Sequence, residues 1–254
     1  MILARRILPF ISPLILIALL SGVLFQPMQW AYWTASIAIV VVLTMGFMVS
    51  WKFRSADFWG ILFPVFTLLA GGIGSLFFVN SLTLRVVYGL LLVTLFGVYI
   101  EDVFIYRFQQ HRYTQLSLPN LSFFISTLGA LTLFSFMFAL RLIGILSVWQ
   151  ITATAVIFGV TFMIHVLWSY QVWHPRYAAY ALLTGLLVGE LAWVLQFWPT
   201  AFFVNGTIMA VLIYVFPSLI QMRLRDTITR ASVTRYIIVC VVTLVAVLTT
   251  SQWT

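Results

Sequence analysis

Long runs of mostly apolar residues, each about twenty residues in length, follow one another along the sequence with short polar segments between them. A helix of that length crosses the ~30 Å hydrocarbon core of a bilayer. Charged residues make up only 7% of the 254 residues, whereas soluble domains have about 25%. A membrane β-barrel would alternate polar and apolar residues instead. We therefore predict an all-α, polytopic transmembrane helical bundle.

The pattern predicts nine spans. The first stretch begins with basic residues, as a signal peptide does, but its apolar part is long and lacks an A-x-A-like cleavage site, so we interpret it as an uncleaved span; cleavage would leave eight. No loop is long enough for a soluble domain, so residues 1–254 form a single membrane domain in this interpretation. The weakest division is at 141–148, an apolar segment that we interpret as a tight turn. The predicted spans are 7–25, 30–50, 57–79, 83–106, 119–140, 149–170, 177–197, 201–221 and 236–250.

The distribution of basic residues predicts the orientation. With the N-terminus inside, the outer side receives only Arg85 and Arg141. The inner side then receives Arg5, Arg6, Lys52, Arg54, Arg107, Arg112, Arg176, Arg223, Arg225, Arg230 and Arg235. Cytoplasmic loops of membrane proteins carry such an excess. We expect a multi-pass protein of a cell membrane, in the bacterial inner membrane, with residues 251–254 outside.

Two ionisable residues fall deep within predicted spans. Glu190 follows Gly185 and Gly189, a small pair that permits close helix approach, so we expect Glu190 to face the interior of the bundle. It is a candidate proton, cation or substrate site, or alternatively a neutral residue that bonds two helices. His165 is a candidate relay in the preceding span, or a packing residue. The two lie too far apart in depth to touch.

A second set of candidates lies at the inner side. Glu101 and Asp102 come near the inner end of a span, and consecutive helical residues point about 100° apart, so spacing alone does not make them an acid/base pair. They indicate a cytoplasmic polar site, or a metal site that recruits a histidine; the alternative is a helix end with local ion pairs. The full candidate set is Glu101, Asp102, His111, Arg112, His174 and Arg176.

The last predicted inner loop carries four arginines against Asp226 alone. Such a cluster binds anionic lipid headgroups, or simply determines topology. We therefore assign the net charge of +8 to the membrane surface, with no nucleic-acid partner. Other membrane proteins are further candidate partners. The cluster consists of Arg223, Arg225, Arg230 and Arg235.

Several classes are excluded by missing motifs. The one lysine, Lys52, lies in a loop, which excludes a retinal Schiff base within a span. The sequence has no H-E-x-x-H, no G-x-S-x-G and no nucleotide-binding glycine loop. A single cysteine, Cys240, excludes an internal disulfide. We expect no cofactor and no metal.

Three functions are compatible with these features. The first is a transporter, a channel-like protein or a membrane subunit of such a complex, with Glu190 as its polar site. The second is a non-catalytic scaffold or assembly subunit, for which weak polar signals are expected. The third is an enzyme that acts on a lipid phosphate at the cytoplasmic face, with Glu101, Asp102 and the inner arginines.

Overall fold

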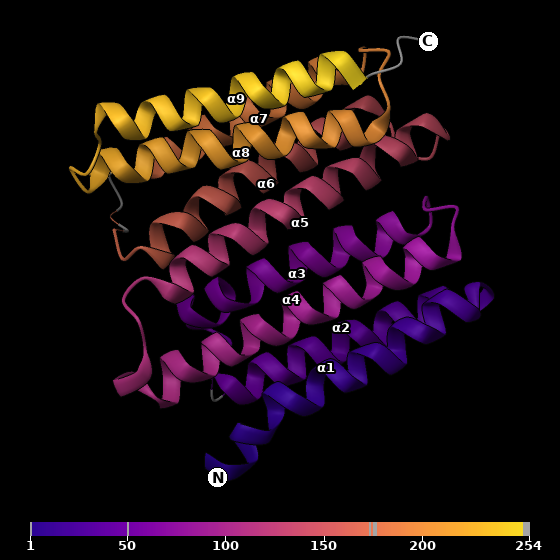
Figure 1. Cartoon of the computed structure of the whole chain (residues 1–254), viewed down its shortest axis with the longest axis vertical. Coiled ribbons are helices and arrows are strands. Elements are labelled where there is room, and N and C mark those ends of the chain that lie inside the picture. Colours follow the sequence, from indigo (N-terminus) through magenta and orange to yellow (C-terminus); the bar gives the residue numbers. More distant parts are fainter. Residues whose placement is uncertain (1, 50, 173, 175–176, 251–254) are drawn as a thin grey trace. The chain divides into compact units, whose positions relative to one another are not determined.

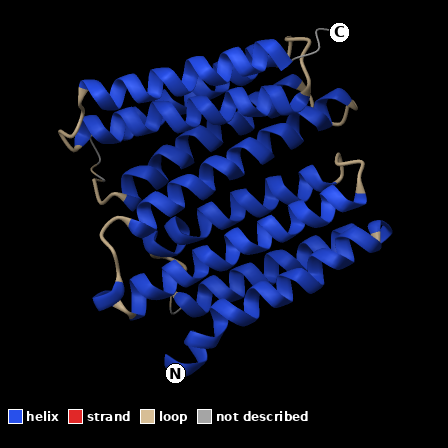
Figure 2. Ribbon diagram, in the orientation of Figure 1, coloured by secondary structure: helices blue, strands red, loops and turns tan. Residues whose placement is uncertain are grey.

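The structure, a computed structural model, describes residues 2–49, 51–172, 174 and 177–250. Within these ranges nine helices are long and apolar enough to cross a membrane, and no strand occurs (Figure 2). The all-helical prediction is thereby confirmed, and the helices indicate a multi-pass membrane protein. Three parts of the predictions fall outside the described residues: Arg176, the end of the second span at residue 50, and the C-terminal segment 251–254.

The helices agree with the predicted spans to within a few residues at most ends (Figure 1). Two short 3-10 turns, η1 (Pro27–Gln29) and η2 (Gln110–Arg112), connect neighbouring helices. The long helices are α1 (Ile2–Phe25), α2 (Trp30–Met48), α3 (Ala56–Leu76), α4 (Leu82–Phe108), α5 (Ser117–Leu142), α6 (Val148–Ser169), α7 (Ala178–Leu195), α8 (Phe202–Leu224) and α9 (Arg230–Thr250).

The largest difference lies at the start of α9. We expected Arg230 and Arg235 in a loop, but both belong to the helix. Thr229 explains the early start, because its hydroxyl accepts a hydrogen bond from the Ser232 amide at 3.2 Å, as a capping residue does. The apolar run marks where a helix can enter hydrocarbon, whereas the capping residue marks where the helix begins.

The segment between α5 and α6 is a tight turn, as predicted. Gly144 adopts a φ of 78°, which glycine tolerates without steric cost. Ser147 and Gln150 then form a reciprocal capping box at the start of α6. The glycine turn and the capping box together reverse the chain direction within a few residues, although the segment is apolar.

The chain divides into two compact units, Met1–Gly129 and Ala130–Thr254. In the first unit α1 packs against α2 and α4, and α3 packs against the same two helices. Of the described spans in this unit, α3 is the most enclosed. A Cβ atom at Gly72 would lie 2.6 Å from the Leu92 side chain, so the glycine-rich part of α3 is a close-packing face.

In the second unit, α6 and α7 form the closest helix pair. A Cβ atom at Gly159 would lie 2.9 Å from the Gly185 Cα, and one at Gly185 would lie 2.8 Å from the Val156 carbonyl oxygen. The close approach expected at Gly185 and Gly189 is therefore present. Helix α8 packs on α6, α7 and α9, while α9 is largely exposed.

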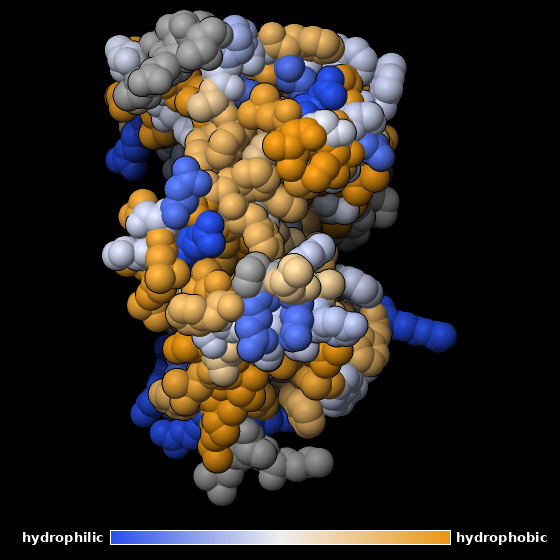
Figure 3. Space-filling model, turned by 90° about the vertical axis from the view of Figure 1, so that its right-hand side faces the viewer, coloured by the Kyte–Doolittle hydropathy of each residue, from blue (hydrophilic) through white to orange (hydrophobic). Residues whose placement is uncertain are grey.

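Apolar side chains also cover much of the surface. Phe10, Ile157 and Trp149 have exposed fractions of 67%, 63% and 72%. The face drawn in Figure 3 shows the same property, with hydrophilic residues in separate patches among hydrophobic ones. A surface of this kind suits lipid as a solvent.

Candidate functional site

The most developed polar arrangement in the first unit begins at Asp102, in the last two turns of α4. The Ser117 hydroxyl, at the start of α5, donates a hydrogen bond of 2.9 Å to the Asp102 Oδ1 atom. Asp102 is half-buried. Its neighbour Glu101 points about 100° away along the helix, and the structure shows no contact that joins the two into a dyad.

Buried hydroxyls continue from Asp102 between α3, α4 and α5. Tyr99, one turn before Asp102, is fully buried, and its hydroxyl donates to the Ile61 carbonyl oxygen at 2.9 Å. The Ser122 hydroxyl donates to the Tyr99 oxygen at 3.4 Å, and Ser126 follows one turn further along α5. We call Asp102, Ser117, Tyr99, Ser122 and Ser126 the polar seam; its members on α5 span about 14 Å along that helix.

Two buried atoms of the polar seam lack a hydrogen-bond partner within the described part of the chain. They are the Asp102 Oδ2 atom and the Ser126 hydroxyl. Most buried side-chain polar atoms are hydrogen-bonded, and an exception signals strain, a catalytic role, or an unseen water or ion. A carboxylate oxygen accepts hydrogen bonds only, so Asp102 suits a ligand that brings a proton or a positive charge.

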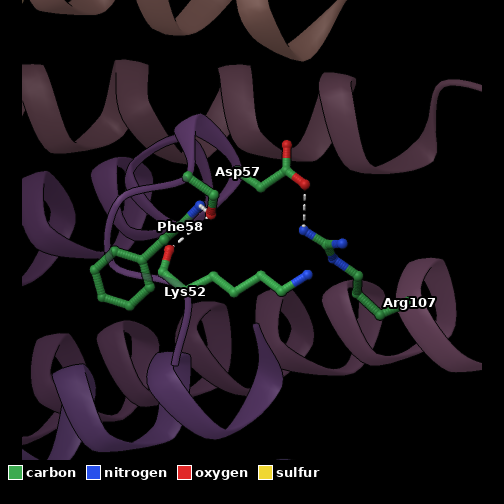
Figure 4. A network of polar contacts seen from close by, with 5 residues as sticks. Lys52, Asp57, Phe58 and Arg107 are labelled. Carbon is green, nitrogen blue, oxygen red and sulfur yellow. Dashed lines mark hydrogen bonds and ion pairs between the residues drawn. The ribbon is translucent and has the colours of Figure 1, made fainter. Parts of the chain in front are cut away.

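An ion pair lies near the same end of α4. The Arg107 Nη2 atom is 2.8 Å from the Asp57 Oδ2 atom, with side-chain exposures of 27% and 49%. Ser55 caps α3 and thereby positions Asp57 in its first turn. Figure 4 shows Lys52 extending beside this pair, with its ammonium group on the side of Arg107. At such exposure the pair contributes at most about 1 kcal/mol to stability.

Tyr113 lies near Asp102, on the side of the loop between α4 and α5. Its hydroxyl accepts a hydrogen bond of 3.2 Å from the Leu118 amide, at the start of α5. Burial raises the pKa of Tyr113, the Leu118 bond lowers it, and the nearby Asp102 charge raises it again. Tyr113 therefore keeps its proton at neutral pH. His111 and Arg112, on η2, are exposed to solvent.

Five of the six cytoplasmic candidates lie within the described residues, and Arg176 does not. Glu101, Asp102, His111 and Arg112 belong to the first unit, whereas His174 belongs to the second and is exposed. The His174 ring lies 5.9 Å from that of Tyr177. Nowhere in the described ranges do three His, Cys, Asp or Glu residues gather as a metal site would require.

The expected interior position of Glu190 is wrong. Its side chain is exposed on α7. Gly185 and Gly189 pack against α6, and Glu190, one residue beyond Gly189, is rotated by about 100° from that contact. A glycine pair thus indicates which side of a helix contacts a neighbouring helix, and the residue that follows the pair points away from that contact.

His165 is buried in α6, with an exposed fraction of 3%, and its ring lies 6.0 Å from Trp168. Helices α6 and α7 run antiparallel through Gly159 and Gly185. His165 and Glu190 lie on opposite sides of that crossing, roughly 16 Å apart along the helices. The expectation that they do not touch agrees with this geometry.

One arginine of the cluster, Arg225, contacts an aromatic ring. The Arg225 guanidinium lies 5.6 Å from the centre of the Tyr170 ring, a cation–π contact. Burial and the nearby Tyr236 raise the pKa of Tyr170 to about 12, although the Arg225 charge lowers it. Arg223, Arg230 and Arg235 are exposed.

Four members of the polar seam were not predicted from the sequence: Tyr99, Ser117, Ser122 and Ser126. A signal for them was present, because Tyr99 and Asp102 are three residues apart, and Ser122 and Ser126 are four apart. Such spacings put residues on one face of a helix. The hydroxyls were overlooked because single serines are common in membrane helices.

A family model described as "Protein of unknown function (DUF5656)" matches residues 50–250. The matched range contains the whole polar seam and Glu190, while α1 and α2 precede it. No curated protein and no solved structure matches the chain.

Proposed function

Since the chain belongs to the DUF5656 family, whose description assigns no activity, we propose a function from the polar seam alone. The chain is a multi-pass membrane protein of transport type, a transporter or the membrane subunit of one, and it takes up a proton at Asp102. This proposal keeps the transport class expected from the sequence and moves its polar site from Glu190 to Asp102.

The charge distribution supports a cytoplasmic N-terminus and a location in the bacterial inner membrane. In the first unit Arg85 follows the α3–α4 turn, whereas the opposite helix ends carry Arg5, Arg6, Lys52, Arg54, Arg107 and Arg112. In the second unit Arg141 lies at one end, and the other end carries Arg223, Arg225, Arg230 and Arg235. Cytoplasmic ends hold such an excess of arginine and lysine. Asp102 is then at the cytoplasmic end of its helix.

One observation carries the proposal: the Asp102 Oδ2 atom is buried and has no donor within the described residues. Ser117 holds the other oxygen, which fixes the orientation of the carboxyl group. Ionisable residues in membrane spans commonly mark proton or ion pathways. A proton from the cytoplasm would bind Oδ2 and remove the negative charge, which burial disfavours.

The hydroxyls beyond Asp102 support uptake toward the interior. Each hydroxyl both donates and accepts a hydrogen bond. Tyr99 donates to the Ile61 carbonyl oxygen and accepts from Ser122, so the orientations of these two hydroxyls are fixed. Ser126 is buried and has no hydrogen-bond partner within the described structure. It lies at the end of the polar seam that is farthest from the cytoplasmic end of α5. The lipid-phosphate enzyme has less support, because Glu101 and Asp102 do not pair.

Asp102→Asn is expected to lower proton uptake strongly. The protein would be reconstituted in liposomes that contain a pH-sensitive dye, and a potassium diffusion potential would drive proton entry. We expect wild-type protein to exceed protein-free liposomes and Asp102→Asn to lower the protein-dependent rate on the order of a hundredfold. The amide has the size of the carboxyl group but does not bind and release a proton in this range.

The matched control is Glu190→Gln, the same chemical change in another span, which should leave the rate unchanged. Ser126→Ala should lower the rate by a smaller factor. A wild-type rate equal to that of empty liposomes would refute proton uptake. That result would favour the scaffold function. If the wild-type rate exceeds that of empty liposomes, an equal rate for Asp102→Asn would refute Asp102 as the site of uptake.

A further inference from the structure

Helix α7 carries one carboxyl group in the middle of an apolar exposed face. Leu186 and Val194 have exposed fractions of 57% and 59%, and Leu183 is also exposed. Glu190 lies between them and is exposed as well. We call Leu183, Leu186, Glu190 and Val194 the Glu190 face; their spacings of three and four residues put them on one side of the helix.

The chain provides no charge partner for Glu190 on the neighbouring helices. Gly185 and Gly189 direct the opposite side of α7 against α6. Neither α6 nor α7 contains a lysine or an arginine, and α8, which also packs on α7, has only Arg223, in its last turn. The basic residues of α8 and α9 lie toward the opposite end of the unit from Glu190, and Arg141 lies in the last turn of α5.

Lipid cannot serve as the partner either. Glu190 lies five residues before the end of α7, or about 8 Å inside the helix. Hydrocarbon offers neither a donor nor an acceptor, and an isolated polar group there costs several kcal/mol. The Glu190 carboxyl group would therefore be stabilised by a polar group from outside the helices packed around it.

We propose that a second copy of this chain docks on the Glu190 face, with a two-fold axis along the membrane normal. Two copies inserted in the same orientation then bring residue 190 opposite residue 190. In its protonated form a carboxyl group both donates and accepts a hydrogen bond, so two protonated Glu190 side chains are complementary across the axis. A different protein would need its own matching polar group at that depth.

The rest of the face is complementary to itself in the same way. Leu186 and Val194, one turn before and after Glu190, meet their own equivalents in the second copy and pack as apolar pairs. Interhelical hydrogen bonds and side-chain packing drive helix association in membranes. The proposal is independent of proton uptake at Asp102, which lies in the other unit.

Cysteine crosslinking in membranes tests the pairing with the full chain. Cys240→Ser removes the natural thiol, and Val194→Cys or Leu186→Cys then places one thiol beside the axis. We expect oxidation to crosslink these variants roughly tenfold more than Val87→Cys. Val87 is a matched control, because it is 58% exposed on α4 and lies five residues from a helix end, a depth between those of Val194 and Leu186 on α7.

Substitutions at Glu190 distinguish the hydrogen bond from simple crowding. In the Val194→Cys background, Glu190→Gln should retain crosslinking, since an amide also donates and accepts. Glu190→Leu should reduce it to the Val87→Cys level, although leucine suits lipid and preserves insertion. Crosslinking that Glu190→Leu does not change would overturn the proposal. So would crosslinks to a different membrane protein with none between copies.

Discussion

Alanine at Gly129 or Gly206 is expected to lower the stability of the protein strongly, whereas alanine at Gly89 is expected to leave it unchanged or slightly higher. A Cβ atom at Gly129 would lie 2.7 Å from the Leu68 amide nitrogen, and one at Gly206 would lie 2.8 Å from the Ser135 amide nitrogen. Backbone atoms cannot rotate away as side chains do, so the helices must separate. Overpacking of this kind costs about 1–3 kcal/mol.

Gly89 is the matched control, because a Cβ atom there meets nothing within 4 Å. Alanine in a helix interior is about 1 kcal/mol better than glycine. Thermal unfolding in detergent measures all three variants, and each kcal/mol corresponds to about 2–4 °C for a chain of this size. Equal melting temperatures for Gly89→Ala and Gly129→Ala would show that α3 and α5 are not in backbone contact at Gly129.

The sequence predicts the helices well because the solvent imposes their length. An apolar run of about twenty residues has few alternatives in hydrocarbon, so residues 57–79 were close to α3 (Ala56–Leu76). Helix starts outside the hydrocarbon depend on caps. Thr229 caps α9, which begins six residues before the predicted start. The extra residues, 230–235, are helical although they precede the apolar run.

The candidate site was predicted only in part, because the direction of a side chain depends on tertiary packing. Asp102 was identified from its charge, but its link to Ser117 depends on where α5 begins relative to α4. Glu190 was assigned to the interior because Gly189 precedes it, and a rotation of about 100° per residue reverses that conclusion. Spacing along one helix is local information, whereas the contact between Tyr99 and Ser122 is not.

Single cysteines in three loops are expected to be labelled from opposite sides of the membrane, in an all-or-none manner. In the Cys240→Ser protein, Asn80→Cys lies between α3 and α4, Thr114→Cys between α4 and α5, and Thr227→Cys between α8 and α9; all three native residues are exposed. If each helix crosses the bilayer once, Asn80 is outside and the other two are inside. The excess of arginine near Thr114 and Thr227 also predicts that both residues are on the cytoplasmic side.

A maleimide that does not cross membranes measures the sides directly. In intact cells it should label Asn80→Cys alone, and in inverted vesicles Thr114→Cys and Thr227→Cys alone; labelling after detergent treatment controls for reactivity. Thr114 tests the first unit and Thr227 the second, so agreement between them requires an even number of crossings from α5 to α8. Labelling of Thr114→Cys and Thr227→Cys from opposite sides would mean that a helix among these does not cross. Asp102 would remain at the Thr114 side, but the assignment of the arginine cluster to the cytoplasm would then be wrong.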